Sequence, residues 1–326
     1  MKILVLSSKG HGLGVAMRLR QEGHKVILKT SNPYEEIGQG LIERETGSLR
    51  KITTNKLDYV IAFGARFGDL SAYFLERDYP VIGSSPFSEM MELSSEYRAT
   101  VLGYLKQEGN VVDRTNGKIA CAWFDGKRFL STCYSGYAHK RLFPGEIGPV
   151  VACSGATLSQ DPSARCNFTQ GLSRSLQAAR YVGPVLAHEG IISSYMYPGV
   201  TECMLTGLQQ PVGNFFDHLI RGNAKIRKTS DWFVTVHISI PPYPHRTPKA
   251  KEIPLRGSSF DKGLKYMWLE DAKWDGELVC AGTSGSIGYV SAHGRCKAEA
   301  MRRAYRCIER MDIPELQYRS DIGKGA

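Results

Sequence analysis

The sequence has no apolar run near the about 18 residues that a membrane-spanning helix needs, and its apolar start, residues 1–6, is too short for a signal peptide. It also has no C-x-x-C pair, internal repeat or low-complexity segment. The eight scattered cysteines therefore indicate neither a metal knuckle nor a disulfide scaffold, and we interpret Cys121 and Cys133 as core thiols. These absences predict a cytoplasmic protein (in the host cytoplasm if it is viral) with no membrane partner and no metal site.

Acidic residues are in the minority. The chain has 42 Lys and Arg against 32 Asp and Glu, which gives a formal charge of +10. Such a surplus favours anionic partners, such as phosphorylated metabolites or nucleic acid. A hydrophobic content of 42% excludes intrinsic disorder, and 326 residues suggest about two domains, or one with an appendage.

Short apolar runs alternate with helical patterns in the first third of the chain. The expected strands are 3–6, 25–28, 59–63 and 80–83, and the expected helices are 14–22, 69–77 and 87–108. This alternation predicts a parallel sheet. The turn at Asp125-Gly126 predicts an antiparallel hairpin over 120–133, and the Gly, Pro and Ser content of residues 134–170 predicts long loops.

The second half gives a coarser pattern. The expected helices are 172–180, 212–221 and 297–310, and the expected strands are 232–240, 278–281 and 287–292. The sequence thus predicts an α/β fold with an N-terminal parallel-sheet domain (1–108), a central mixed region (109–230) and a C-terminal α+β lobe (231–326).

A glycine-rich loop follows the first expected strand and contains Lys9, Gly10, His11, Gly12 and Gly14. Glycines let the backbone approach a ligand closely, and the N-terminus of the next helix offers N–H groups to an anion. The spacing fits neither a P-loop nor a full G-x-G-x-x-G motif. We therefore keep two interpretations, a phosphate-binding loop and a tight turn without a ligand.

A second candidate site is the run His139, Lys140 and Arg141, placed in the loop expected after the hairpin and followed by Gly148. An imidazole beside two fixed cations can accept a proton and hold a phosphate at one place. The alternative is a solvated basic loop.

Further basic residues lie near aromatic ones in the C-terminal third. The helix expected at 297–310 carries Arg302, Arg306 and Arg310 at i, i+4 and i+8. Such a row is typical of the solvated face of an amphipathic helix, and interleaved cations and aromatics also suit nucleic acid.

The C-terminal motifs resemble a known family. A-G-T at 281–283, I-G-Y-V-S-A-H-G at 287–294 and Y-R-S-D-I-G at 318–323 are similar, in order and spacing, to the last domain of phosphoribosylamine–glycine ligase, a member of the ATP-grasp superfamily. I-G-S-S at 82–85 and H-K-R at 139–141 with Gly148-Pro149 fit the same order, although Ala138 replaces an aspartate of the family pattern. The resemblance implies an ATP-grasp-like fold in which Gly148, Arg319 and Asp321 belong to the substrate site.

Two parts of the family pattern are missing. The family has an ATP-clamping subdomain between the helix ending near residue 108 and the hairpin near residue 125, where this chain has about 16 residues, fewer than one βαβ unit needs. The segment matching its metal-binding motif, residues 192–202, lacks the Mg²⁺-binding carboxylate and amide. Phosphoryl transfer from ATP needs Mg²⁺ and a phosphate cradle, so the resemblance implies a reduced architecture that uses no ATP and no other cofactor.

A phosphate pocket and an amino-acid pocket can still form a C–N bond if the acceptor already carries a leaving group. Bacteriophages that hypermodify thymidine use such an amino acid:DNA transferase, which places glycine on a phosphomethyl-pyrimidine. The resemblance and the charge of +10 favour this reading, with glycine or another amino acid and a phosphorylated acceptor, DNA in the favoured case, as partners. Two alternatives remain, a phosphoribosylamine–glycine ligase and a non-catalytic binding module on that fold.

In the transferase reading, His139 is the general base for the attacking amine, and Lys140 and Arg141 hold the departing phosphate. These three residues are expected to lie opposite the 10–14 loop and Asp321, and Asp321 fixes the glycine ammonium by its charge. The amino acid, the flipping of a target base and the oligomeric state are left open.

Overall fold

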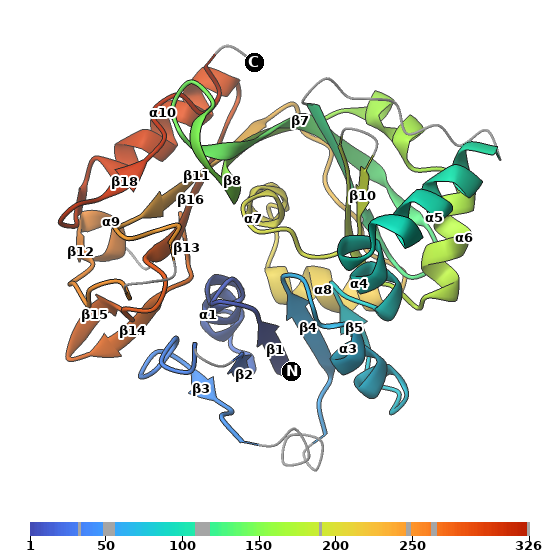
Figure 1. Cartoon of the computed structure of the whole chain (residues 1–326), viewed down its shortest axis with the longest axis horizontal. Helices are drawn as coiled ribbons and strands as arrows, with labels where there is room; N and C mark the ends of the chain where they lie inside the picture. Colours follow the sequence, from blue (N-terminus) through green and yellow to red (C-terminus); the bar gives the residue numbers. More distant parts are fainter. Residues whose placement is uncertain are drawn as a thin grey trace.

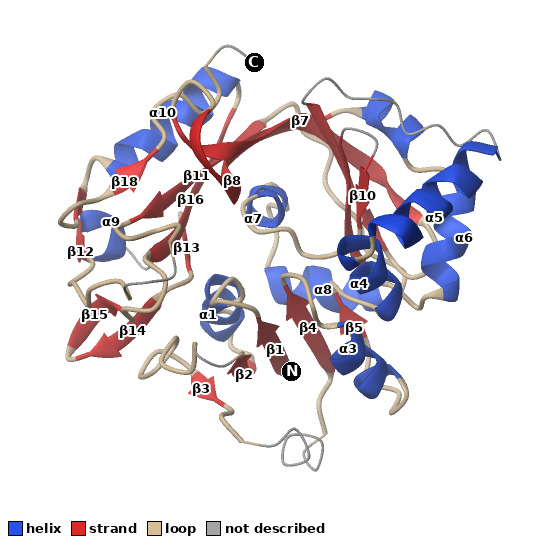
Figure 2. Ribbon diagram, in the orientation of Figure 1, coloured by secondary structure: helices blue, strands red, loops and turns tan. Residues whose placement is uncertain are grey.

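The computed structural model describes residues 1–31, 34–47, 56–107, 118–188, 191–245, 249–261 and 266–324. Within these ranges the chain forms a parallel sheet and a larger antiparallel sheet, with helices at the rim and in the middle of the view (Figures 1 and 2). The mixed α/β fold class predicted from the sequence is confirmed. A search of the same ranges finds no helix that is both long and apolar enough to cross a membrane.

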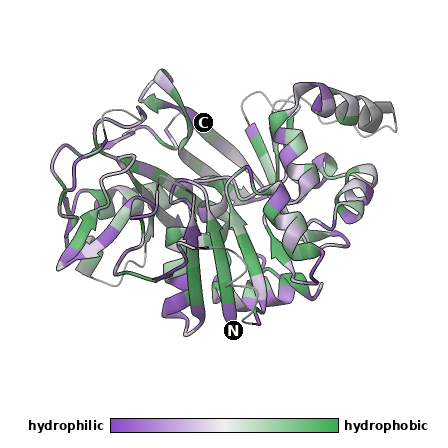
Figure 3. Cartoon of the chain, turned by 60° about the horizontal axis from the view of Figure 1, so that its bottom comes forward, coloured by the Kyte–Doolittle hydropathy of each residue, from purple (hydrophilic) through white to green (hydrophobic). Residues whose placement is uncertain are grey.

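The parallel sheet is built from the first third of the chain. Its strands, in the order β3-β2-β1-β4-β5, are β1 (Lys2–Ser7), β2 (Lys25–Thr30), β3 (Glu43–Arg44), β4 (Tyr59–Phe63) and β5 (Val81–Ile82). Leu4 and Leu6 pack with Phe74 of α3 (Gly68–Leu75) on one face, and Ile3 and Val5 pack with α1 (Leu13–Gln21) on the other. Covering on both faces explains why these strands are continuous apolar runs, which Figure 3 shows as mostly hydrophobic bands near the N-terminus.

The antiparallel sheet is built from the rest of the chain. Its strands, in the order β10-β9-β6-β7-β8-β11-β16-β13 with β18 beside β11, are β6 (Lys118–Phe124), β7 (Phe129–Phe143), β8 (Ile147–Gln160), β9 (Gly183–His188), β10 (Ile191–Ser193), β11 (Trp232–Ser239), β13 (Met267–Leu269), β16 (Ser286–Gly294) and β18 (Gln317–Tyr318). The accompanying helices are α4 (Pro86–Leu93), α5 (Ser95–Gln107), α6 (Gln170–Ala178), α7 (Val200–Thr206), α8 (Val212–Ile220) and α10 (Lys297–Ile308). Short elements complete the fold: the 3-10 helix η1 (Pro162–Asn167), α9 (Ser258–Asp261), the pair β12 (Arg256–Gly257) and β17 (Met311–Asp312), and the pair β14 (Ala272–Asp275) and β15 (Glu277–Cys280).

The long loops predicted for residues 134–170 are wrong. β7 and β8 extend the predicted hairpin through most of this range, and η1 follows them. Glycine here serves close strand packing: a Cβ on Gly136 would lie 1.8 Å from the Thr157 carbonyl oxygen. Glycine, serine and proline favour turns, but small residues also fit closely spaced strands, and that second role applies here.

One expected helix is divided in the structure, and the remaining elements lie close to their expected positions. The single helix expected at 87–108 is two helices, because Ser94 is extended and its hydroxyl accepts the Tyr97 N–H at 3.1 Å, which starts α5. The other expected helices and strands are found within a few residues of their predicted ends.

The domain boundaries stay predictions. Strands from both sides of residue 230 share the antiparallel sheet, since β11 pairs with β8 and β16. The boundary at 108/109 lies outside the described residues. Residues 108–117 separate α5 from β6 and lie outside the described residues, so the expected absence of a clamp subdomain at this place stays a prediction.

The two sheets meet where β1 and β4 end. Phe63, the last residue of β4, forms a parallel bridge with Met196, and the Gly83 N–H donates to the Val182 oxygen at 2.7 Å. On the other side α1 lies against β13, with a Cβ on Gly14 only 2.7 Å from the Trp268 Cα. The carboxyl ends of the parallel strands therefore face residues of the antiparallel sheet.

Candidate active site

A crevice lies at the carboxyl ends of β1 and β4. The chain leaves β1 toward β2 on one side, and β4 lies on the other, so this is the switch point at which open parallel sheets bind ligands. The crevice contains a cavity of about 480 Å³. Its walls come from the loop after β1 (Ser8, Lys9, His11), the loop after β4 (Gly64, Ala65, Arg66, Phe67), and Ser31, Tyr34, Ala152, Tyr195 and Pro198.

A second cavity of about 230 Å³ lies beside the first and shares Lys9, His11, Tyr34 and Ala152 with it. The remaining walls come from strands of the antiparallel sheet and the loops next to them: Val150, Val151, Tyr243, Pro244, His245, Ser284 and Ser286. Among the four shared residues, His11 is the one that carries an imidazole, and it comes from the centre of the glycine-rich loop. The two adjacent cavities offer room for two substrates, both in contact with His11.

His11 is the first member of a buried polar chain. Its Nδ1 lies 2.6 Å from Glu270 Oε1, and the Ser286 hydroxyl donates to Glu270 Oε2 at 2.5 Å. His237 Nε2 lies 2.7 Å from the same Ser286 oxygen. Because the serine proton is used on Glu270, the His237 N–H must donate to Ser286. The carboxylate likewise requires an N–H on His11 Nδ1, which leaves Nε2 of the neutral ring as a proton acceptor.

The charges of this chain follow from its surroundings. Burial raises the pKa of Glu270, but His11 and the Ser286 hydroxyl outweigh it, so the net pKa is lowered and the carboxylate stays ionised. Burial lowers the pKa of His237 to about 4, so that ring is neutral at pH 7. The nearby Glu202 has its pKa raised by burial and by the charge of Glu270. One ionised carboxylate therefore orients His11.

The glycines of the loop have a packing role. A Cβ on Gly10 would lie 2.6 Å from the Glu270 carbonyl oxygen, and one on Gly12 would lie 2.8 Å from a Val5 methyl group. The Gly12 N–H already donates to the Ser7 hydroxyl at 3.0 Å. The glycines bring the loop against the antiparallel lobe, and Lys9 and His11 supply the side chains at the cavities.

The structure does not bring His139, Lys140 and Arg141 to one point. They lie in strand β7, which corrects the loop expected there, and none of them lines the two cavities described above. His139 Nδ1 lies 2.6 Å from Glu146 Oε1, whereas Arg141 donates to the Gly148 oxygen at 2.9 Å.

Lys140 acts on a different group of residues. Burial, and next the charge of Lys140, lower the pKa of His188 to about 4. Burial raises the pKa of Glu92, and the Ser193 hydroxyl, Arg98 and Lys140 oppose that rise. The charge of Lys140 is therefore felt by His188 of β9 and Glu92 of α4.

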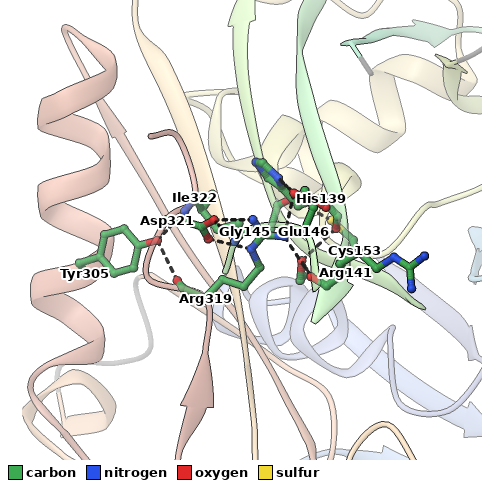
Figure 4. A network of polar contacts seen from close by, with 11 residues as sticks. His139, Arg141, Gly145, Glu146, Cys153, Tyr305, Arg319, Asp321 and Ile322 are labelled. Carbon is green, nitrogen blue, oxygen red and sulfur yellow. Dashed lines mark hydrogen bonds and ion pairs between the residues drawn. The ribbon is translucent and has the colours of Figure 1, made fainter. Parts of the chain in front are cut away.

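Arg319 and Asp321 form a network with the β7–β8 hairpin (Figure 4). Arg319 is 1% exposed and donates to both Asp321 oxygens (2.7 and 2.8 Å) and to Glu146 Oε1 (2.8 Å). Asp321 also accepts the Gly145 N–H at 2.9 Å. Burial opposes ionisation, but Arg319 and this N–H lower the pKa of Asp321 to about 2. Gly148 lies at the hairpin end against the Phe143 ring.

Several residues of the site were missed by sequence reasoning. Glu270 lies 259 positions from His11, and no local pattern could connect the two. Arg66 had a usable signal, since it closely follows the expected strand 59–63, and parallel-sheet sites lie just beyond such strand ends.

Comparison with solved structures identifies the fold. A crystal structure of phosphoribosylamine–glycine ligase from Thermotoga maritima matches with a TM-score of 0.69 at 16% identity over 99% of this chain and 100% of that chain. N5-carboxyaminoimidazole ribonucleotide synthetase from T. maritima gives 0.55 at 10% identity (96% and 99% covered), and the biotin carboxylase subunit of a pyruvate carboxylase gives 0.62 at 8% (97% and 92%).

The chain has an ATP-grasp-type fold. The arrangement predicted from the C-terminal motifs is thereby confirmed. No family model matches the sequence, and no curated protein does.

Proposed function

We propose that this chain is a transferase that joins the amine of glycine, or of another amino acid, to a phosphorylated acceptor with loss of phosphate. The supporting observation is His11, which contacts Glu270 and lines two adjacent cavities. A base so placed can deprotonate an amine in one cavity while the acceptor occupies the other. The acceptor we propose is a phosphomethyl-pyrimidine in DNA, in keeping with the charge of +10.

Each of these residues has its own role in the proposed reaction. Lys9 and Arg66 line the larger cavity and would hold the phosphate by charge. The amine nitrogen forms a bond to the methylene carbon, the bond from that carbon to the phosphate oxygen breaks, and the phosphate leaves with the electron pair. The amine proton passes to His11 Nε2. Glu270 stabilises the imidazolium that results.

The decisive assay omits ATP. The protein is incubated with glycine and an oligonucleotide that carries a phosphomethyl-pyrimidine, with EDTA present, and the nucleosides are identified by mass spectrometry together with released phosphate. A glycyl adduct supports the proposal. Binding of the oligonucleotide without a product would indicate a binding module.

The fold favours a second candidate, a ligase that makes a C–N bond at the expense of ATP. The similarity to phosphoribosylamine–glycine ligase is its support. The same assay with a phosphoribosylamine acceptor and Mg-ATP distinguishes it, because only the ligase would release ADP.

A further inference from the structure

The end of the β7–β8 hairpin is an exposed apolar surface. Phe143, Ile147 and Val150 are 43%, 63% and 62% exposed, and Phe143 pairs directly with Ile147 across the hairpin. Large apolar side chains gathered at one exposed tip are typical of a contact site. We name these three residues the hairpin tip.

The tip is held rigidly. Arg319 donates to Glu146 in the turn and to the Arg141 oxygen, and Asp321 accepts the Gly145 N–H. The Ser154 hydroxyl lies within 3.0 Å of the carbonyl oxygens of both His139 and Arg141, where the strand register shifts. An apolar tip fixed in this way enters a partner without a large ordering cost.

The tip is also continuous with the candidate active site. Val150 belongs to the tip and to the wall of the smaller cavity, together with His11. Residues 147 to 151 of β8 span about 13 Å in an extended strand. A polymer that contacts the tip would therefore have its neighbouring units close to the cavities.

Exposed arginines lie beside the tip and on the helix that is tied to its network, while Glu146 in the turn is paired with Arg319. Arg141 is exposed beside the tip, and α10 is tied to the same network because Tyr305 bonds to the Arg319 oxygen and the Ile322 N–H. Arg302 and Arg306 of α10 are exposed one turn apart. Figure 1 shows α10 beside the end of β7 and β8. Apolar wedges flanked by arginines are how proteins unstack bases while holding the phosphates.

We propose that the hairpin tip inserts into the base stack of a DNA acceptor and that Arg141, Arg302 and Arg306 hold its backbone. This rests on the proposed function for the choice of acceptor, but it concerns binding alone. Unstacking at the tip would release the target nucleotide toward the cavities, as in enzymes that take a base out of the duplex before they act on it.

The test uses duplex DNA that contains 2-aminopurine, whose fluorescence rises on unstacking. We expect the full-length protein to bind the duplex and raise the signal. The double variant Phe143→Ser/Ile147→Ser should bind roughly 10-fold or more weakly and leave the signal low. Leu93→Ser, at an equally exposed leucine of α4, is the matched control and should behave as wild type.

The cation part is tested by salt. Arg302→Gln/Arg306→Gln should lower the slope of log affinity against log salt by about 0.7–0.9 for each phosphate that the variant no longer neutralises. The control Arg77→Gln, just after α3 beside the parallel sheet, should leave the slope unchanged. Thermal unfolding of each variant checks that the fold is kept.

Unchanged binding and fluorescence in the tip variant would overturn the proposal. So would a tip variant that loses only self-association or binding to lipid vesicles, since the tip would then serve another partner. If the tip variant fails to unstack DNA while the wild type makes no glycyl adduct, the docking surface stands and the proposed chemistry fails. A tip variant that turns over DNA at the wild-type rate overturns the docking surface and leaves the chemistry standing.

Discussion

Two histidines of this protein are held in the same way and lie in different surroundings. His11 and His139 each have Nδ1 2.6 Å from a glutamate oxygen, of Glu270 and Glu146 respectively. His11 lines two cavities, whereas His139 Nε2 is buried without a hydrogen-bond partner among the described residues. A carboxylate–imidazole pair is therefore not by itself a catalytic unit, and access to a substrate space separates the two pairs.

The largest effect should come from removing the cavity imidazole. His11→Ala should lower turnover by roughly 10²–10⁴, as expected for loss of a general base. His139→Ala tests the sequence-based assignment, and we expect it to keep most of the activity because His139 lines neither cavity. Rates with phosphomethylated DNA, compared with the exposed-histidine control His218→Ala, measure the difference. If His139→Ala loses the activity and His11→Ala keeps it, the roles are reversed.

The ion pairs that Arg319 makes at the β7–β8 hairpin should affect the stability of the fold more than its activity. Arg319→Met removes the buried guanidinium that pairs with Asp321 and Glu146. Because the two carboxylates are 27% and 52% exposed, we expect the loss of these charge-assisted hydrogen bonds to cost roughly 1.5–3 kcal/mol. Because the pKa of Asp321 is lowered to about 2 in the folded protein, its stabilising contribution is present above about pH 4 and lost as the pH falls toward 2.

Denaturant unfolding at pH 7 and pH 3 measures this contribution. The gap between wild type and Arg319→Met should narrow at the lower pH. A gap that is the same at both values would remove Asp321 from the explanation.

One glycine lies next to each histidine–glutamate pair, and the two glycines differ in the space available for a Cβ. Gly10 has φ +90° and no room for a Cβ, while Gly145 has φ +74° and no atom within 4 Å of a Cβ. Gly145→Ala should cost roughly 1–2 kcal/mol from backbone strain alone. Gly10→Ala adds a clash with the Glu270 carbonyl and should cost about 1–3 kcal/mol more. Equal losses in urea unfolding would show that the loop yields at no cost.

The smallest expected effect is that of nucleotide. Withholding ATP or adding EDTA should leave turnover unchanged, because the proposed acceptor already carries its leaving group and the reaction then needs no phosphoryl transfer from ATP. A rate measured with and without Mg-ATP checks this. Activity that vanishes without ATP would instead support the alternative function, an ATP-dependent ligase.

The local patterns of the chain determined much of its fold. Continuous apolar runs predicted the buried parallel strands such as β4, Asp125-Gly126 predicted the start of the hairpin, and the spacing of 297–310 predicted α10. These signals are readable because backbone periodicity and turn geometry act over a few residues. The C-terminal motifs added the ATP-grasp-type architecture, which the structural comparison confirms.

Only the tertiary structure decided which polar residues meet. Lys9 and His11 were candidates from the sequence, and the fold brings Glu270, Ser286 and His237 to them from strands and loops more than two hundred residues away. The run at 139–141 looked like one site, but residues in a strand point to different sides, so Lys140 lies near Glu92 while His139 contacts Glu146. Local patterns record backbone geometry, and a site depends on contacts between distant segments, which form only when the two sheets pack together.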